Sequence, residues 1–110
     1  MQVVIHDDRA RLPTRGQVGY DLVCIEKVDV SGFTYDTGIS VKAPEGYYAE
    51  IVAKSSVVKH NTMLAGGIID PNDRETLKIR LTSHVECPFS LCQIILRPMP
   101  PDIQVNKINL

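Results

Sequence analysis

The sequence lacks a charge excess of either sign, and it lacks a long apolar run. Its 110 residues include 12 Lys and Arg against 13 Asp and Glu, which leaves a formal net charge of -1. That balance gives no electrostatic basis for a nucleic-acid or membrane surface. The apolar runs are far shorter than the about 20 residues that a bilayer-spanning helix needs. The first residues also lack the charged start and apolar core of a signal peptide, so we expect an intracellular protein without nucleic-acid or membrane partners.

Cysteine and histidine are scarce and scattered. Cys24, Cys87 and Cys92 form an odd set without a Cys-x-x-Cys pair, which argues against a disulfide framework and against a zinc site. The three histidines share no close metal-ligand spacing. Cys24 and Cys92 lie in apolar runs, so we expect both thiols to be buried as small hydrophobic side chains.

Short β-rich segments between turn signals make up most of the chain. Hydrophobic residues account for 44% of it, which is enough for one packed core. Strands are expected in residues 2–5, 20–30 (broken near Glu26-Lys27), 33–41, 47–53, 76–82 and 90–97. Residues 57–63 fit either one helical turn or an irregular loop, and no amphipathic helix is expected. The pattern predicts an all-β sandwich or barrel in one domain over residues 1–110.

The short tail from about residue 101 to residue 110 has its own pattern. Ile103, Val105 and Ile108 alternate with polar residues there, which is compatible with a last strand. A short β-rich chain leaves sheet edges uncovered, and oligomerisation is one common way to cover them. The tail is therefore a candidate for a strand lent to a neighbouring subunit.

One stretch, Leu64 to Arg74, combines two glycines, a short apolar run and a turn-forming cluster. Alternating residues follow it, so the pattern predicts a strand, a tight hairpin and a second strand, with Asp70 at the mouth of the hairpin. Gly66 and Gly67 would allow close approach of backbone or of a flat ring such as a nucleobase. The alternative is a surface hairpin in which Asp70 only caps a turn.

Four short segments, spread over most of the chain, follow one another in a characteristic order, and the stretch around Asp70 is one of them. They are Gly19-Tyr20-Asp21-Leu22, Ala53-Lys54-Ser55-Ser56-Val57, Gly67-Ile68-Ile69-Asp70 through Arg74, and Cys92-Gln93-Ile94-Ile95. In order and spacing, the chain resembles the trimeric dUTPase (dUTP diphosphatase) family. The resemblance implies a jelly-roll or β-clip barrel, usually a homotrimer with active sites at subunit interfaces. It also implies hydrolysis of dUTP to dUMP and pyrophosphate with Mg²⁺.

The resemblance also assigns roles to individual residues. Asp70 matches the acid that orients and activates the attacking water, and Asp21 matches the acid that holds magnesium through its waters. The residues matching the phosphate-binding positions are Lys54, Ser55, Ser56, Gln93 and Arg74. Those matching the nucleoside pocket are Gly66, Gly67, Ile69 and Asp73.

Several positions depart from the family pattern. Lys54 replaces an Arg, which keeps the charge but loses the bidentate fork. Asp73 replaces the Tyr that packs under the deoxyribose, and Glu75 replaces a Gly. Pro88-Phe89-Ser90 replaces the usual Gly-Asp-Arg before Gln93. No Gly follows Gly67, so the glycine-rich C-terminal arm of the family is expected to be absent.

These features leave two main hypotheses. The first is a small dUTP diphosphatase, with looser sugar discrimination at Asp73. The second is a catalytically weak or inactive relative that acts as a nucleotide sensor or binds a protein partner. The retained Asp21, Ser56, Asp70 and Gln93 favour the enzyme. A third alternative, the related dCTP deaminases, is less supported because those proteins are longer and need a general-base Glu in its own setting.

Overall fold

The computed structural model describes residues 1–69 and 74–110, so Asp70 and Asp73 lie outside the described residues. The elements, in chain order, are β1 (Gln2–Ile5), β2 (Thr14–Arg15), β3 (Tyr20–Cys24), β4 (Glu26–Lys27), β5 (Thr34–Asp36), β6 (Ile39–Lys42), β7 (Tyr47–Ala53), the 3-10 helix η1 (Ser55–His60), β8 (Leu64–Ala65), β9 (Ile68–Ile69), β10 (Lys78–Leu81) and β11 (Phe89–Pro98). The expectation of an all-β fold is confirmed.

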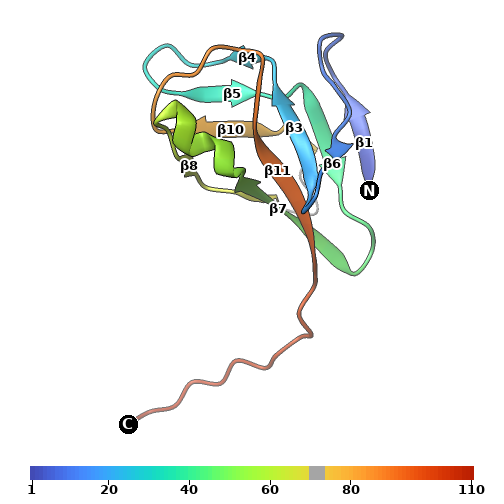
Figure 1. Cartoon of the computed structure of the whole chain (residues 1–110). Helices are drawn as coiled ribbons and strands as arrows, with labels where there is room; N and C mark the ends of the chain where they lie inside the picture. Colours follow the sequence, from blue (N-terminus) through green and yellow to red (C-terminus); the bar gives the residue numbers. More distant parts are fainter. Residues whose placement is uncertain (70–73) are drawn as a thin grey trace.

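The strands form three sheets (Figure 1). The largest has the order β2-β3-β11-β7-β9, the second has the order β4-β5-β10-β8, and β1 pairs with β6. Every pairing among the described residues is antiparallel. In Figure 1, β5 and β10 run across β3 and β11, so the two larger sheets form the layers of a sandwich.

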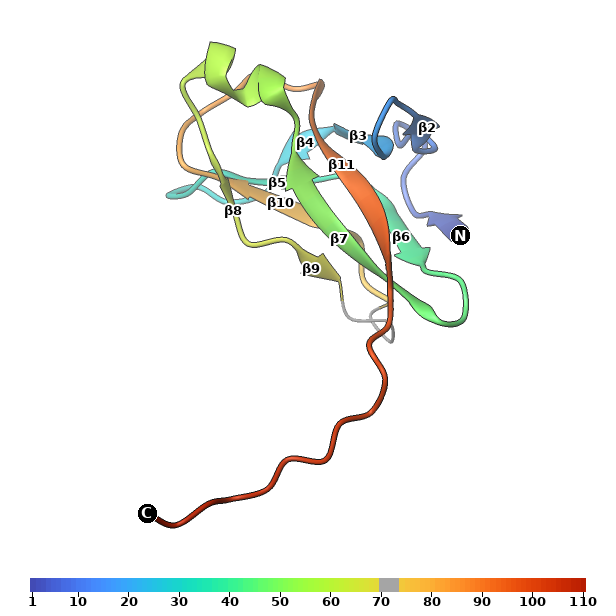
Figure 2. The ribbon, with the colours of Figure 1, turned by 60° about the horizontal axis from the view of Figure 1, so that its bottom comes forward.

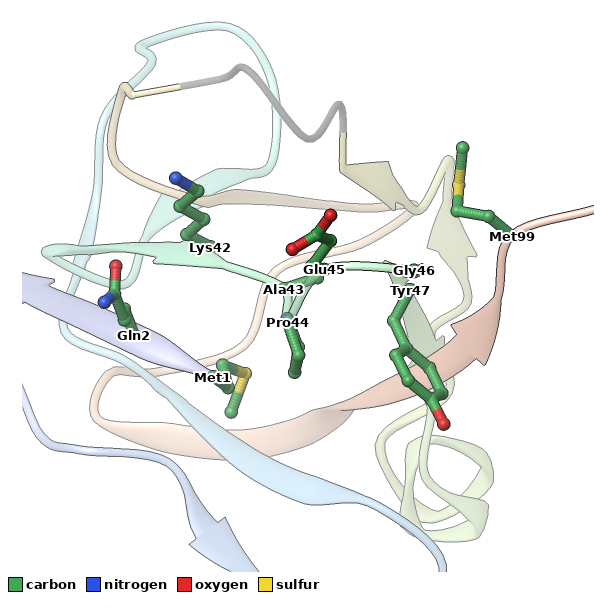
Figure 3. Close-up of a pocket in the computed structure, with 9 residues that line it drawn as sticks. All are labelled: Met1, Gln2, Lys42, Ala43, Pro44, Glu45, Gly46, Tyr47 and Met99. Carbon is green, nitrogen blue, oxygen red and sulfur yellow. The ribbon is translucent and has the colours of Figure 1, made fainter.

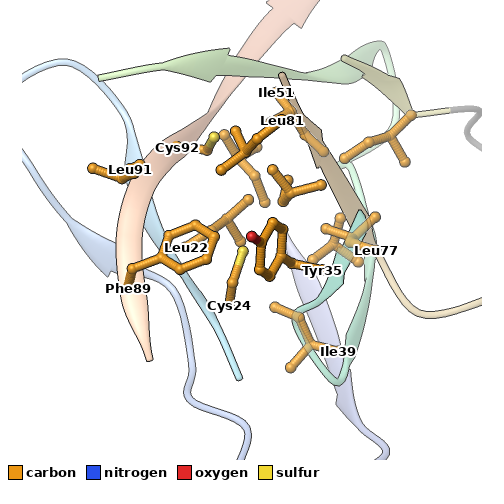
Figure 4. Packing of buried hydrophobic residues seen from close by; sticks show 14 of the residues in the cluster. Leu22, Cys24, Tyr35, Ile39, Ile51, Leu77, Leu81, Phe89, Leu91 and Cys92 are labelled. Carbon is orange, nitrogen blue, oxygen red and sulfur yellow. The ribbon is translucent and has the colours of Figure 1, made fainter. Parts of the chain in front are cut away.

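The core fills the space between these layers, and Tyr35 lies near its centre (Figure 4). Its ring is fully buried and meets Phe89 edge to face, with ring centroids 4.9 Å apart. Its hydroxyl accepts a hydrogen bond from the backbone N–H of Val85 at 2.9 Å. Cys24 and Cys92 are buried beside it, as expected, and burial raises the pKa of the Cys92 thiol to about 11.

The single strand expected over residues 33–41 is wrong, because the chain breaks there into β5 and β6, which join different sheets. Gly38, with a φ of +72°, turns the chain in a conformation that L side chains rarely adopt. The hydroxyl of Thr37 donates to the carbonyl of Leu77 at 2.9 Å and fixes this corner.

The hairpin expected around Asp70 also needs correction. β9 pairs with β7, whereas β10 pairs with β5 and β8, so the strands on either side of residues 70–73 belong to different sheets. Gly66, with a φ of +86°, redirects the chain from β8 to β9. The short apolar run predicts β9 and the alternation of Leu77, Ile79 and Leu81 predicts β10, but neither pattern shows which strands they pair with.

Residues 99–110 extend away from the sandwich without helix or strand (Figures 1 and 2). The last strand expected there is therefore absent from this described segment of the single chain. Residues 57–63 resolve into the end of η1 and a connection to β8. Over the described residues, no helix has the length and apolar character to cross a membrane.

Candidate functional site

Three of the predicted site residues come together where β3, β11 and the end of β7 meet. Asp21 on β3 and Gln93 on β11 are direct cross-strand partners, so their side chains share one face of the sheet. Lys54 follows β7 directly, and its backbone N–H donates to the carbonyl of Leu91 at 2.8 Å. Its Nζ lies 3.2 Å from Oδ2 of Asp21. The structure thus unites an acid, a cation and an amide from three of the four motifs.

Lys54 has a second neighbour that the sequence did not single out as a site residue. Its Nζ lies 3.5 Å from Oγ of Ser90 on β11, at the limit of a hydrogen bond. Ser90 occupies the position where the family pattern has an Arg. The replacement of that Arg by Ser was the sequence feature that pointed to this position. In the structure, the Nζ of Lys54 lies near both Ser90 and Asp21.

Two glycines allow this cluster to be compact. A Cβ on the buried Gly19 would lie 2.5 Å from the carbonyl oxygen of Ile94 and 3.1 Å from Oε1 of Gln93. A Cβ on Gly16 would lie 3.2 Å from Oδ1 of Asp21. The chain before β3 therefore packs against the very side chains that form the site.

Ser55 and Ser56 begin η1, immediately after Lys54 (Figure 2). Ser55 is exposed, whereas Ser56 is partly buried. The Oγ of Ser56 is buried and has no hydrogen-bond partner among the described residues. A buried hydroxyl without a partner costs about 1–3 kcal/mol, and this makes Ser56 a notable polar group beside the cluster.

Gly66, Gly67 and Ile69, which are predicted to contact the nucleoside, lie elsewhere. β9 is at one edge of the five-stranded sheet, and β7 and β11 separate it from β3. A Cβ on Gly67 would lie 2.3 Å from the carbonyl oxygen of Ile51, so the glycine is required by the backbone of β7. At Gly66 a Cβ would meet no described atom within 4 Å. The open side of this turn is therefore at Gly66.

Two further predicted residues can be placed near this edge. The side chain of Ile69 is 6% exposed and belongs to the core, so only its backbone is available to a nucleoside. Arg74 is exposed. A hollow of about 270 Å³ lies beside the turn, with Gly66, Gly67 and Arg80 in its lining. The described residues of one chain thus hold two separate parts of the predicted site.

A larger groove of about 670 Å³ lies away from both parts (Figure 3). It is lined by Met1, by Gln2 at the start of β1, by the turn from Lys42 to Tyr47, and by Met99. None of the predicted site residues that the structure describes lines this groove. Its position beside β1 places it at the sheet edge near the point where the tail leaves the sandwich.

The oxygen donors at this site fit a magnesium ion that keeps most of its bound water molecules. Asp21 offers a carboxylate, and no group of three or more His, Cys, Asp or Glu side chains is gathered for a metal in the part of the chain described. Mg²⁺ usually keeps several waters and is bound through one or two carboxylates together with substrate phosphates. The residues present suit that mode of binding and do not suit an all-protein cage.

Comparison with known proteins agrees with this geometry. A family model described as dUTPase matches residues 9–107. The deoxyuridine 5'-triphosphate nucleotidohydrolase of Yarrowia lipolytica is 33% identical over 99% of this chain and 78% of its own length. The protein of the same name from Debaryomyces hansenii is 32% identical over 83% of this chain and 61% of its own length. The chain thus spans about three fifths to four fifths of these relatives.

Solved structures share the fold. A mutant dUTPase from Staphylococcus bacteriophage 80alpha with dUpNHpp superposes with a TM-score of 0.75, at 20% identity over 99% of this chain and 89% of that chain. A mutant dUTPase from phage phi11 of S. aureus, a structure that reveals the coordination of a structural Mg(II) ion, has a TM-score of 0.73 at 19% identity, over 96% of each chain.

The structure is a β-sandwich in which an acid on β3, an amide on β11 and a lysine directly after β7 lie together. With the family match over nearly its whole length, the chain belongs to the dUTPase family.

Proposed function

We infer that this protein hydrolyses dUTP to dUMP and pyrophosphate. The observation that carries the inference is the cluster of Asp21, Lys54 and Gln93 in a chain that belongs to the dUTPase family. Hydrolysis of a triphosphate requires cations and hydrogen-bond donors that absorb negative charge as the bond breaks. The cluster supplies an ammonium group and an amide, and the hydroxyl of Ser56 lies beside them in sequence.

Magnesium belongs to this proposal as the partner of Asp21. A bound Mg²⁺ would neutralise charge on the phosphate oxygens. Asp21 would hold its waters, because a carboxylate oxygen is a hard ligand for a hard ion. Lys54, Ser55, Ser56, Gln93 and Arg74 would bind the phosphates. Among these, Ser56 can donate without adding charge.

Asp70 would orient and activate the attacking water, as an acid held near the phosphates can do. The turn containing Gly66, Gly67 and Ile69 would supply backbone groups to the uracil, and Asp73 would face the sugar. Since β11 and β7 separate β3, which carries Asp21, from the turn with Gly66 and Gly67 and from β9, we infer that one active site combines parts from more than one chain. We therefore propose a homotrimer with shared sites.

The tail offers a way to hold such a trimer together. Ile103, Val105 and Ile108 are between 76% and 93% exposed, which is unfavourable for apolar side chains in a free monomer. β1 pairs only with β6 among the described strands, so its other edge is open. A tail from a neighbouring subunit could add to that edge, next to the groove of Figure 3.

The direct test is pyrophosphate release from dUTP with Mg²⁺. We expect release by the unmodified chain and a loss of at least about a hundredfold in Asp70→Asn, because general-base catalysis contributes on this scale. Asp102→Asn, in the exposed tail, is the matched control and should keep full activity. Absence of release with dUpNHpp binding intact would instead indicate a nucleotide-binding protein without hydrolysis.

The alternative of an inactive sensor or protein-binding module is not favoured, because the relatives described above are named nucleotidohydrolases. The intracellular location and the single domain over residues 1–110 stay predictions from the sequence.

A further inference from the structure

We propose that Lys54 acts as an exchangeable counter-ion for Asp21. When no nucleotide is bound, the ammonium group of Lys54 pairs with the carboxylate of Asp21 and competes with a free metal ion. Metal and triphosphate therefore enter the site together. The inference rests on the proposed function and concerns the order of binding, which that function leaves open. It starts from the ion pair of 3.2 Å between Nζ of Lys54 and Oδ2 of Asp21.

This ion pair lowers the affinity of the site for a free divalent cation. The charges of Lys54 and Asp21 cancel, and the described residues gather no group of three potential metal ligands that could compensate. A metal ion arriving alone must displace the ammonium group from the carboxylate. A metal–triphosphate complex carries net negative charge, so it offers Lys54 a new partner when it takes Asp21.

Lys54 has the longer and more flexible side chain of the pair, so its ammonium group can reach a new partner more readily than the short side chain of Asp21 can. The backbone of Lys54 is fixed by its hydrogen bond to Leu91, but its flexible four-carbon stem lets the ammonium group reorient. The side chain is 28% exposed, and its contact with Ser90 is long at 3.5 Å. Asp21 is paired in register with Thr14 and Gln93 on either side. When the ligand binds, the ammonium group of Lys54 therefore moves to a new partner while the carboxylate of Asp21 keeps its position.

The pair is weak enough to open. Both side chains are roughly 30% exposed, and ion pairs at such positions shift an equilibrium by at most about fivefold. Lys54 thus competes with free metal without preventing the metal–triphosphate complex from binding. An Arg at this position would hold the carboxylate through two parallel hydrogen bonds and would release it less readily.

The experiment measures metal binding without turnover. Mn²⁺ is titrated into the protein without nucleotide and followed by electron paramagnetic resonance. We expect Lys54→Met to bind Mn²⁺ about fivefold more tightly than the unmodified chain, and Lys54→Arg to bind it no more tightly. Lys42→Met, which removes an exposed lysine of β6, is the charge-matched control and should change nothing. An unchanged or lower affinity in Lys54→Met would overturn the proposal.

A second arm uses calorimetry with dUpNHpp in EDTA. Asp21→Asn frees Lys54 for the phosphates, so we expect it to bind the metal-free analogue several-fold more tightly than the unmodified chain and to lose this advantage with Mn²⁺. Weaker binding by Asp21→Asn in EDTA would contradict the exchange. If no variant bound dUpNHpp under either condition, the proposed function would fail, whereas the Mn²⁺ titration would still decide whether Lys54 blocks metal at Asp21.

Discussion

At the scale of single residues, Gly19 controls the geometry of the site. Its missing side chain lets the start of β3 lie against β11, at the level of Ile94 and Gln93. Any side chain here would push β3 away from β11 and move Asp21 relative to its partner Gln93. Gly19 therefore supports the site without taking part in its chemistry.

We expect Gly19→Ala to lower the free energy of unfolding by about 1–3 kcal/mol, because its Cβ would lie 2.5 Å from a backbone oxygen and the strands must separate. Urea denaturation measures this change. Pyrophosphate release should fall in the same variant, since the metal-holding acid is displaced.

The control is Gly46→Ala, on a turn outside the site. Its φ of +82° makes Ala strained, but the new Cβ would meet no described atom within 4 Å. Stability should fall by about 1 kcal/mol while activity is kept. Equal activity in both variants would show that the β3–β11 spacing does not matter for turnover.

At the scale of elements, Tyr35 connects β5 to the segment that leads into β11. The hydroxyl accepts the hydrogen bond of the buried Val85 N–H, and His84 Nδ1 lies 3.5 Å away. Since β11 carries Gln93 and Ser90, this connection helps to position the site from the opposite layer of the sandwich.

Tyr35→Phe should reduce the free energy of unfolding by about 1–3 kcal/mol, because the ring remains but the N–H of Val85 loses its partner. Thermal or urea unfolding gives the value. The matched change Tyr47→Phe alters a side chain that is 45% exposed and should stay within about 0.5 kcal/mol of the unmodified chain. Similar losses in both would refute the assigned role of the hydroxyl.

The strands also show which parts of the fold can be predicted from the sequence. β7 lies where it was expected, because buried Ala49 and Ile51 alternate with partly exposed neighbours. The break between β5 and β6 was missed, because a single glycine within a stretch of residues typical of strands does not reveal the corner that Gly38 makes. Likewise, the apolar run at β9 and the period of two residues at β10 predict strands but carry no information on their partners.

For the candidate site, the sequence predicted which residues belong to it but not the contacts between them. Motif resemblance identified Asp21, Lys54 and Gln93, and the structure brings them together. The ion pair between Lys54 and Asp21 was not foreseen, because it depends on how the end of β7 meets β3 across β11. The contact of Lys54 with Ser90 was missed for the same reason.

At the scale of the whole molecule, the proposed trimer predicts a definite mass. Static light scattering should give three times the mass of one chain, because β11 and β7 separate Asp21 on β3 from the predicted nucleoside-binding residues at β9 within one chain. A monomer mass would contradict the shared site.

Paired variants of the tail extend this test. We expect Ile103→Asp combined with Val105→Asp to shift the trimer toward monomer, since charged side chains oppose burial in a neighbouring subunit. Gln104→Asp combined with Asn106→Asp alters the intervening polar positions and should leave the mass unchanged. A trimer that withstands the first pair would show that the tail does not hold the subunits together.

The sheet order has a consequence for how the protein is made. β11 lies between β3 and β7, although it follows both of them in the chain and is the last of the described strands. Until it emerges, the nascent chain holds β3 and β7 with unpaired edges, which are the surfaces that promote misassociation. Asp21 and Lys54 are likewise brought together only by β11, so this part of the site forms only after that strand has been synthesised.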